Sequence, residues 1–235
     1  MAHSLLLLLK GPLQSWGDES RYTTRATGNT PSKSGVIGML AAAQGRQRTD
    51  PIEDLVQLDF AVRVDQSGSL LSDYQTAQPW QKNPNAAAHL VTRNFLSDAA
   101  FVAAIGSEDR GLLEGLQEQL KHPAYPLFLG RRSCPVPPNL DLGIIDKPVV
   151  EALREHDIWH ATLTHKKERS RHVELPIYRD GKPGEVGVPR QDVPLSFAQE
   201  HRKYGWRTVV NAGSKTIQND LGTNRDPFFE TVISS

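Results

Sequence analysis

Cysteine, excess charge and long apolar segments are all scarce in this chain, and each shortage excludes a class of protein. Cys134 is the only cysteine among 235 residues, so an internal disulfide or a cysteine zinc cluster is excluded and a reducing compartment is expected. The 27 lysines and arginines balance 27 aspartates and glutamates, which disfavours a free nucleic-acid-binding protein. This balance still permits local basic patches, or partners that supply much of the charge.

The leucine run at residues 5–9 is too short for a signal core, and no lysine or arginine precedes it. No other segment approaches the length of a membrane-spanning helix. The run predicts instead a strand that is buried on both faces. We therefore expect a cytoplasmic protein without membrane contacts.

Signature motifs of common enzymes are also missing. The chain holds no H-E-x-x-H zinc motif, no G-x-S-x-G nucleophile motif and no evident pair of catalytic acids. Ser32 precedes Lys33 where a nucleotide-binding P-loop requires glycine, and the aromatic octapeptide of common RNA-binding sheets is absent. We therefore expect neither a zinc hydrolase nor a nucleotide triphosphatase, and no metal site or cofactor.

The order of predicted elements indicates an α+β protein with two domains. Apolar spacing predicts strands at 4–10, 58–65, 70–76 and 126–129 and helices at 34–44 and 109–121. Regular structure is also expected to resume at 95–105, after the insertion. This β-α-β-β-α-β order with an insertion at about 77–94 matches a ferredoxin-like, or RRM-like, domain. The proline-rich stretch 134–138 predicts the boundary between a domain at 1–133 and a smaller β-rich domain at 134–235. That second domain carries a helix at about 148–156, a hairpin turn at 179–182 and a loosely held tail after residue 213.

The start of the helix at 34–44 is a candidate phosphate site. Unpaired N–H groups and the positive end of the helix dipole meet there, and Ser32, Lys33, Ser34 and Gly35 suit a phosphate. Arg21 and Arg25 in the preceding loop would add contacts. The alternative is an ordinary serine cap beside solvated cations.

Three further places offer side chains to a ligand. For the arginine pair and the insertion described below, the alternative is a solvated surface segment. Trp16 stands between two glycines after the first strand, where it would stack on a base or pack between domains. Arg131 and Arg132 end the last predicted strand of the first domain. The insertion resembles a finger that wedges between bases of a single strand, and it carries Trp80, Lys82, His89 and Arg93.

The most basic stretch runs from His160 to His172, and it would contact RNA backbone or form a solvated hairpin face.

Five motifs together resemble one protein family. GPLQSWG at 11–17, TPSKSGVIGMLAAAQG at 30–45, YQTA at 74–77, TRNFLSDAAFVAAI at 92–105 and LGRRSCP at 129–135 span the first domain in order. They resemble the CasD family of the RAMP superfamily, the handle-binding subunits of the type I-E CRISPR complex Cascade. The resemblance weakens over the last hundred residues.

The resemblance implies a non-catalytic subunit that binds and caps the 5′ handle of the CRISPR RNA (crRNA). It implies that the insertion is a thumb that packs on the Cascade backbone subunit, that the large subunit docks nearby, and that target DNA is met only indirectly. Position and chemistry then assign RNA contacts to Gln14, Trp16, Arg21, Arg25, Ser32, Lys33, Ser34, Gly35, Tyr74, Trp80, Lys82, His89, Arg93, Arg131 and Arg132.

Two rival functions remain open at this point. Related RAMP proteins of another subtype cleave precursor RNA without metal, which requires a base and a cation. Candidates for that chemistry in this chain are Tyr74, His89, Lys82 and Lys33. The second rival is a general RNA-binding or ribonucleoprotein-assembly factor outside CRISPR systems.

Overall fold

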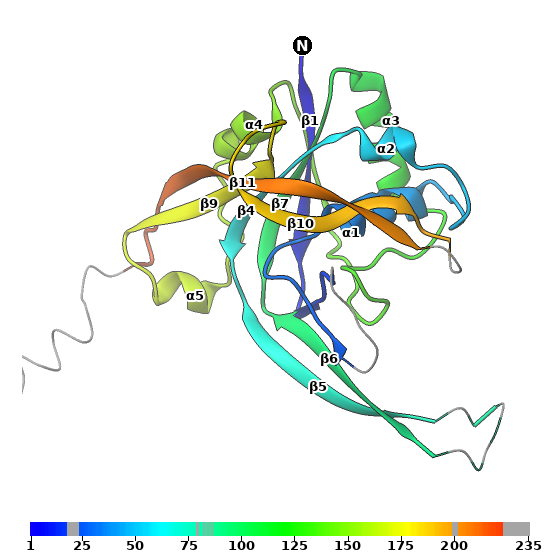
Figure 1. Ribbon diagram of the computed structural model, residues 1–235. Coiled ribbons are helices and arrows are strands. Elements are labelled where there is room, and N and C mark those ends of the chain that lie inside the picture. Colours follow the sequence, from blue (N-terminus) through cyan, green and yellow to red (C-terminus); the bar gives the residue numbers. More distant parts are fainter. Residues whose placement is uncertain are drawn as a thin grey trace, which may run out of the picture.

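The computed structural model describes residues 1–17, 24–78, 80–81, 83, 85, 87–198 and 202–222. It is a mixed α/β structure with a seven-stranded sheet and a four-stranded sheet, and a long hairpin projects from the body as an arm (Figure 1). Within the described ranges, no helix is long and apolar enough to cross a membrane.

The larger sheet has the order β10-β11-β9-β4-β7-β1-β8, and the smaller one has the order β2-β6-β3 with β5 paired to β6. The strands are β1 His3–Lys10, β2 Leu13–Gln14, β3 Thr24–Arg25, β4 Asp59–Gln66, β5 Ser69–Ala77, β6 His89–Ser97, β7 Ala100–Ser107, β8 Asp141–Ile145, β9 His172–Asp180, β10 Val188–Ser196 and β11 Lys203–Gln218. The helices are α1 Lys33–Ala43, α2 Glu53–Val56, α3 Arg110–Lys121, α4 Val149–Glu155 and α5 Leu163–Lys167.

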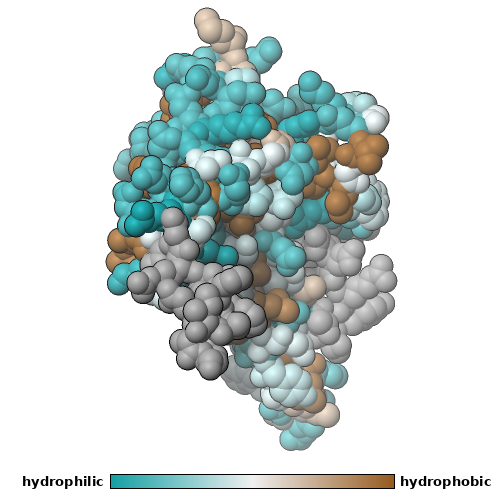
Figure 2. Space-filling model, turned by 90° about the vertical axis from the view of Figure 1, so that its left-hand side faces the viewer, coloured by the Kyte–Doolittle hydropathy of each residue, from teal (hydrophilic) through white to brown (hydrophobic). Residues whose placement is uncertain are grey.

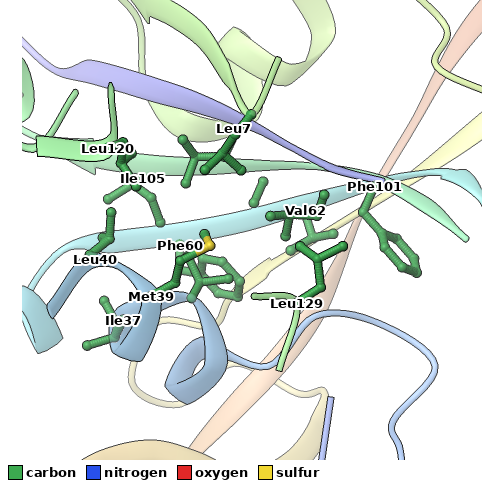
Figure 3. Close-up of a cluster of buried hydrophobic side chains, with 14 of the residues drawn as sticks. Leu7, Ile37, Met39, Leu40, Phe60, Val62, Phe101, Ile105, Leu120 and Leu129 are labelled. Atoms are coloured by element: carbon green, nitrogen blue, oxygen red, sulfur yellow. The ribbon is translucent and has the colours of Figure 1, made fainter. Parts of the chain in front are cut away.

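β1 lies inside the larger sheet and is buried on both faces, as the leucine run predicts. Leu5, Leu7 and Leu9 pack with α1 and α3 in the main core, whereas Leu6 packs with α4 on the opposite face. Figure 3 shows side chains from α1, α3 and the sheet converging in the main core. Each such leucine contributes about 1.5–3 kcal/mol when it leaves water, so this layer holds the body of the molecule together.

The arm is a bent continuation of β4 and β7. Gly68 (φ +71°) follows β4 and Asp98 (φ 55°) precedes β7, and at these two residues the chain leaves the larger sheet. β5 and β6 then pair from Ser69↔Ser97 to Ala77↔His89. The expected insertion at 77–94 is therefore wrong in its bounds, because Ala77 ends β5 and residues 89–94 belong to β6.

Three other expectations for the second half are also wrong. Residues 126–129 form no strand of the larger sheet, because Phe128 makes only an isolated bridge to Pro135. The strand that pairs with β1 in their place is β8, Asp141–Ile145. β11 separates β9 from β10, so residues 179–182 close no hairpin. β11 also runs on to Gln218, which keeps the chain after residue 213 in the sheet that far.

The division into two domains stays a prediction. The larger sheet nevertheless runs across the expected boundary, because β9 pairs with β4.

Candidate nucleic-acid interface

At the start of α1, where a phosphate site is predicted, carboxylates of this chain take the place of an external anion. The backbone N–H of Lys33 donates to Asp192 Oδ2 at 2.9 Å, and Lys33 Nζ donates to Asp180 Oδ2 at 2.8 Å and to Leu58 O at 3.0 Å. Lys33 is only 6% exposed. The helix end and the lysine are thus both neutralised within the protein.

Arg207 ties the same two carboxylates to β11. Its Nε and Nη2 contact Asp192 at 2.5 and 2.8 Å, its Nη1 contacts Asp180 at 2.6 Å, and its guanidinium lies 5.3 Å from the ring of Phe60. Burial lowers the pKa of Arg207, but the hydrogen bonds and negative charges of Asp192 and Asp180 together outweigh it, and the pKa lies above its ordinary value. This network joins α1 to β9, β10 and β11 and has a structural role.

Other predicted RNA contacts near α1 are buried as well. Gln14 Nε2 donates to Leu9 O and Ala99 O, and its Oε1 accepts from Trp16 Nε1 at 2.9 Å. Trp16 is 1% exposed and lies so close to Gly35 that a Cβ there would sit 2.8 Å from the ring.

The serines of the same turn serve the helix itself. Ser32 caps α1 by accepting from Gly35 N at 3.2 Å, and Ser34 is buried beside it. Gln14, Trp16, Ser32, Ser34 and Gly35 therefore pack at the junction of β1, β6 and α1. This arrangement favours the packing and capping alternatives over base or phosphate contacts, which stay predictions.

The structure brings three of the predicted arginines together at the root of the arm. Arg25 on β3 stands in register with Arg93 on β6. Arg131 Nη2 donates to Arg25 O at 3.0 Å, and its guanidinium lies 4.7 Å from the ring of Phe95. We call Arg25, Arg93 and Arg131 the arginine cluster.

The arginine cluster is short of acceptors. Arg93 Nε and Arg131 Nη1 are buried without a hydrogen-bond partner in the described part of the chain. Asp73 stands opposite Arg93 in the β5–β6 register, but its carboxylate accepts from Gln75 Nε2 and forms no ion pair among the described residues. Each buried donor left unpaired costs about 1–3 kcal/mol, so the free protein is less stable for having this cluster.

Electrostatics at the cluster favours an anion. Burial lowers the pKa of Arg131, and the positive charges of Arg93 and Arg25 lower it further, while Cys134 opposes the shift. A phosphate group would supply acceptors to the unpaired donors and offset the repulsion through charge-assisted hydrogen bonds. The arrangement thus has the chemistry of a phosphate-binding site.

The two faces of the arm differ in character. Residues directly opposite each other share a face, so the pairs Ala77↔His89 and Asp73↔Arg93 place His89 on the face of the arginine cluster. Tyr74 pairs with Thr92 on the other face. That other face exposes apolar side chains, namely Leu70, Tyr74 and Leu90.

The remaining predicted residues have varied positions. Trp80 lies at the tip of the arm with 65% of its surface exposed, and Arg132 is exposed beside the cluster. Arg21 and Lys82 lie outside the described residues. Sequence reasoning missed Phe95 as the platform under Arg131, and no local signal links two residues so far apart in the chain.

Comparisons with known proteins agree on one family. The family model for CRISPR-associated protein (Cas_Cas5) matches residues 4–210. The CRISPR system Cascade subunit CasD of Escherichia coli (strain K12) is 34% identical over 162 residues, which cover 61% of this chain and 71% of CasD. These matches confirm the resemblance that the five motifs predict.

Solved structures give the same result. A chain of a CRISPR RNA-guided surveillance complex is 29% identical with a TM-score of 0.76, over 97% of this chain and 96% of that one. A crystal structure of a Cas protein is 32% identical with a TM-score of 0.65, over 95% of this chain and all of the other. The chain therefore belongs to the Cas5 family of CRISPR-associated proteins.

Proposed function

We propose that this protein is a non-catalytic RNA-binding subunit of a type I-E Cascade complex and that it caps the 5′ handle of crRNA. One observation carries the proposal: the arginine cluster holds two buried donors without partners, on arginines from β6 and from the loop after residue 130. Single-stranded RNA offers phosphates and splayed bases that would satisfy such donors. Membership of the Cas5 family supplies the CRISPR context.

The fold supports the same role. β1, α1, β4, β7, α3 and β8 follow one another in the order β-α-β-β-α-β, and their strands neighbour one another as β8-β1-β7-β4. We take this unit as the ferredoxin-like domain of the RAMP type, with the β5–β6 arm as its thumb.

The two faces of the arm suit contacts with RNA on one side and with a protein subunit on the other. Its one face carries His89 and Arg93 toward the handle, and Trp80 at the tip would stack on a base, which contributes about 1–3 kcal/mol. Its other face exposes Leu70 and Tyr74, and we assign that face to the adjacent backbone subunit. The large subunit would dock nearby, and target DNA would be met only through the assembled complex.

The arrangement of the nuclease candidates favours the non-catalytic role. Tyr74 and His89 lie on opposite faces of the arm, and Lys33 is buried in the network with Asp180. A general base and its cation must reach the same reacting atoms, and these three groups do not converge.

Co-expression of the tagged protein with a repeat array and the other complex subunits tests the proposal. We expect processed RNA with a common 5′ handle to co-purify, and we expect Arg93→Ala/Arg131→Ala to lose that RNA. Arg48→Ala/Lys121→Ala, which removes two cations elsewhere on the surface, serves as the matched control. Recovery of cleaved repeat RNA with this protein alone, in EDTA, would instead establish the nuclease function.

A further inference from the structure

A second group of cations lies in the segment 166–171, which begins in α5 and ends just before β9. It holds Lys166, Lys167, Arg169 and Arg171 with Glu168 as the only acid. None of the four cations forms an ion pair with a carboxylate in the described ranges, and all except Lys166 are largely exposed. We call these four cations the basic loop.

The basic loop is held in shape by the residue that follows β11, next to the start of β9. Asn219, just after β11, is 3% exposed, and its Nδ2 donates to Lys166 O at 2.7 Å and to Ser170 O at 3.0 Å. Its backbone N–H donates to Arg171 O at 2.7 Å. One buried asparagine thus binds three carbonyls of the loop, and a loop ordered before binding loses less entropy when a ligand arrives.

The contacts within the basic loop leave its charge intact. Lys166 Nζ lies 5.3 Å from the ring of Trp159, and Arg169 Nε donates to His165 Nε2 at 3.3 Å. Burial and then the charge of Arg169 lower the pKa of His165, so the imidazole accepts as a neutral group. These contacts orient the cations without neutralising them.

The basic loop and the arginine cluster lie along one surface of the molecule. Arg93, Phe95 and Ser97 are alternate residues of β6 and therefore share one face. Ser97 lines a hollow of about 500 Å³ whose other wall is formed by α5 and Arg169. Asp98 and Glu168 line the hollow together with Arg169, so the hollow itself is not positively charged. The cations that would meet a phosphate are those of the basic loop at its rim. Figure 2 views the molecule from the side of α5, where hydrophilic residues predominate among the coloured atoms.

We infer that the basic loop is a second backbone-binding site for the same single strand of RNA, which crosses the root of the arm between Arg93 and Arg169. The inference rests on the proposed function, because it assumes that the arginine cluster holds the first part of that strand. Charge complementarity favours a polyanion, and the polar hollow that continues from the face of Arg93 favours a single strand over a rigid duplex.

The test compares how RNA binding by the full chain depends on salt for two RNA lengths. The probes are single-stranded RNAs of about 4 and about 16 nucleotides, the limits of common single-strand sites. The variant is Lys167→Ala/Arg169→Ala/Arg171→Ala, and the matched control is Arg48→Ala/Lys121→Ala/Lys147→Ala. For the longer RNA, we expect the slope of log K against log salt to fall by about 2 in the variant, at about 0.7 for each phosphate contact.

For the shorter RNA we expect the variant to bind like the control, since that RNA reaches only the arginine cluster. Asn219→Ala, which keeps every cation, should weaken binding of the longer RNA alone. If the loop variant matches the control with both RNAs while Arg93→Ala/Arg131→Ala abolishes binding, the inference is wrong and the proposed function stands. If neither set of changes affects binding, the proposed function fails as well. Equal losses for both RNAs, or tighter binding of duplex DNA that depends on the loop, would also overturn the single-strand path.

Discussion

The start of α1 and the root of the arm both gather cations, yet their surroundings give them opposite roles. At α1, Lys33 and Arg207 meet the carboxylates of Asp180 and Asp192. At the arm, Arg93 and its neighbours meet no carboxylate in the part of the chain that the structure describes. A cation that pairs with a carboxylate of its own chain stabilises the fold. A cluster of cations without such a carboxylate can bind an external anion.

Removing the carboxylate of Asp192, which contacts the start of α1 from β10, gives the largest expected effect on stability. Asp192→Ala leaves the buried guanidinium of Arg207 without its bidentate partner and opens the N-terminus of α1. We expect the free energy of unfolding to fall by about 3–5 kcal/mol, measured by denaturant unfolding. Asp54→Ala breaks the partly exposed pair with Arg46 and should cost at most about 1 kcal/mol. Similar small costs for both variants would show that the α1 network is not structural.

Protonating the neighbouring imidazoles of His156 and His160 gives a smaller effect on stability. His160 Nε2 lies 2.8 Å from His156 Nε2, and burial lowers the pKa of His160 to about 4, with Asp65 opposing and His156, Arg63 and Lys10 reinforcing the shift. The unfolded chain titrates near 6.5 and so binds more protons than the folded one between these values. Stability is therefore full above about pH 6.5 and falls as the pH approaches 4.

We expect that loss to be about 1–2 kcal/mol, because solvent reaches part of the ring and screens the charge. His160→Gln should flatten unfolding curves recorded between pH 4 and 7, relative to wild type. A decline that persists unchanged in the variant would assign the pH dependence to other groups.

The smallest expected effect on stability lies at the arm. Arg93→Met removes one of three like charges together with a buried donor that has no partner, and the lost packing of the arginine stem offsets part of that gain. The free energy of unfolding should therefore not fall, and should rise by up to about 1 kcal/mol. Thermal unfolding of the full chain measures this. A large loss of stability would mean that the cluster is structural, like the network at α1.

The sequence predicts β1, α1 and α3 well because their signals are local. The leucine run marks a doubly buried strand, and α3 at Arg110–Lys121 begins one residue after the predicted start, with Asp109 as its cap. The fourth strand was misplaced because residues 126–129 are apolar enough for a strand, yet β1 pairs with Asp141–Ile145. Such a choice depends on tertiary pairing, which no short window of sequence contains.

The candidate site also has a part that the sequence predicts and a part that only the fold reveals. Arg25, Arg93 and Arg131 were predicted individually as RNA contacts, and only the fold shows that they share one place. Its position at a helix start makes Lys33 a candidate, but its partners stand about 150 residues further along the chain, at Asp180 and Asp192. Residue types and local spacing thus identify possible ligand groups, but long-range partners decide which of them stay free.

The most direct test of the contrast is the salt dependence of single-stranded RNA binding by the full chain. For Arg93→Ala/Arg131→Ala we expect the slope of log K against log salt to fall by about 1.4, at about 0.7 for each phosphate contact. Lys33→Met should leave that slope unchanged and lower the stability instead, because Lys33 Nζ is bonded to Asp180 and Leu58. A reduced slope in Lys33→Met together with an unchanged slope in the double variant would contradict the account.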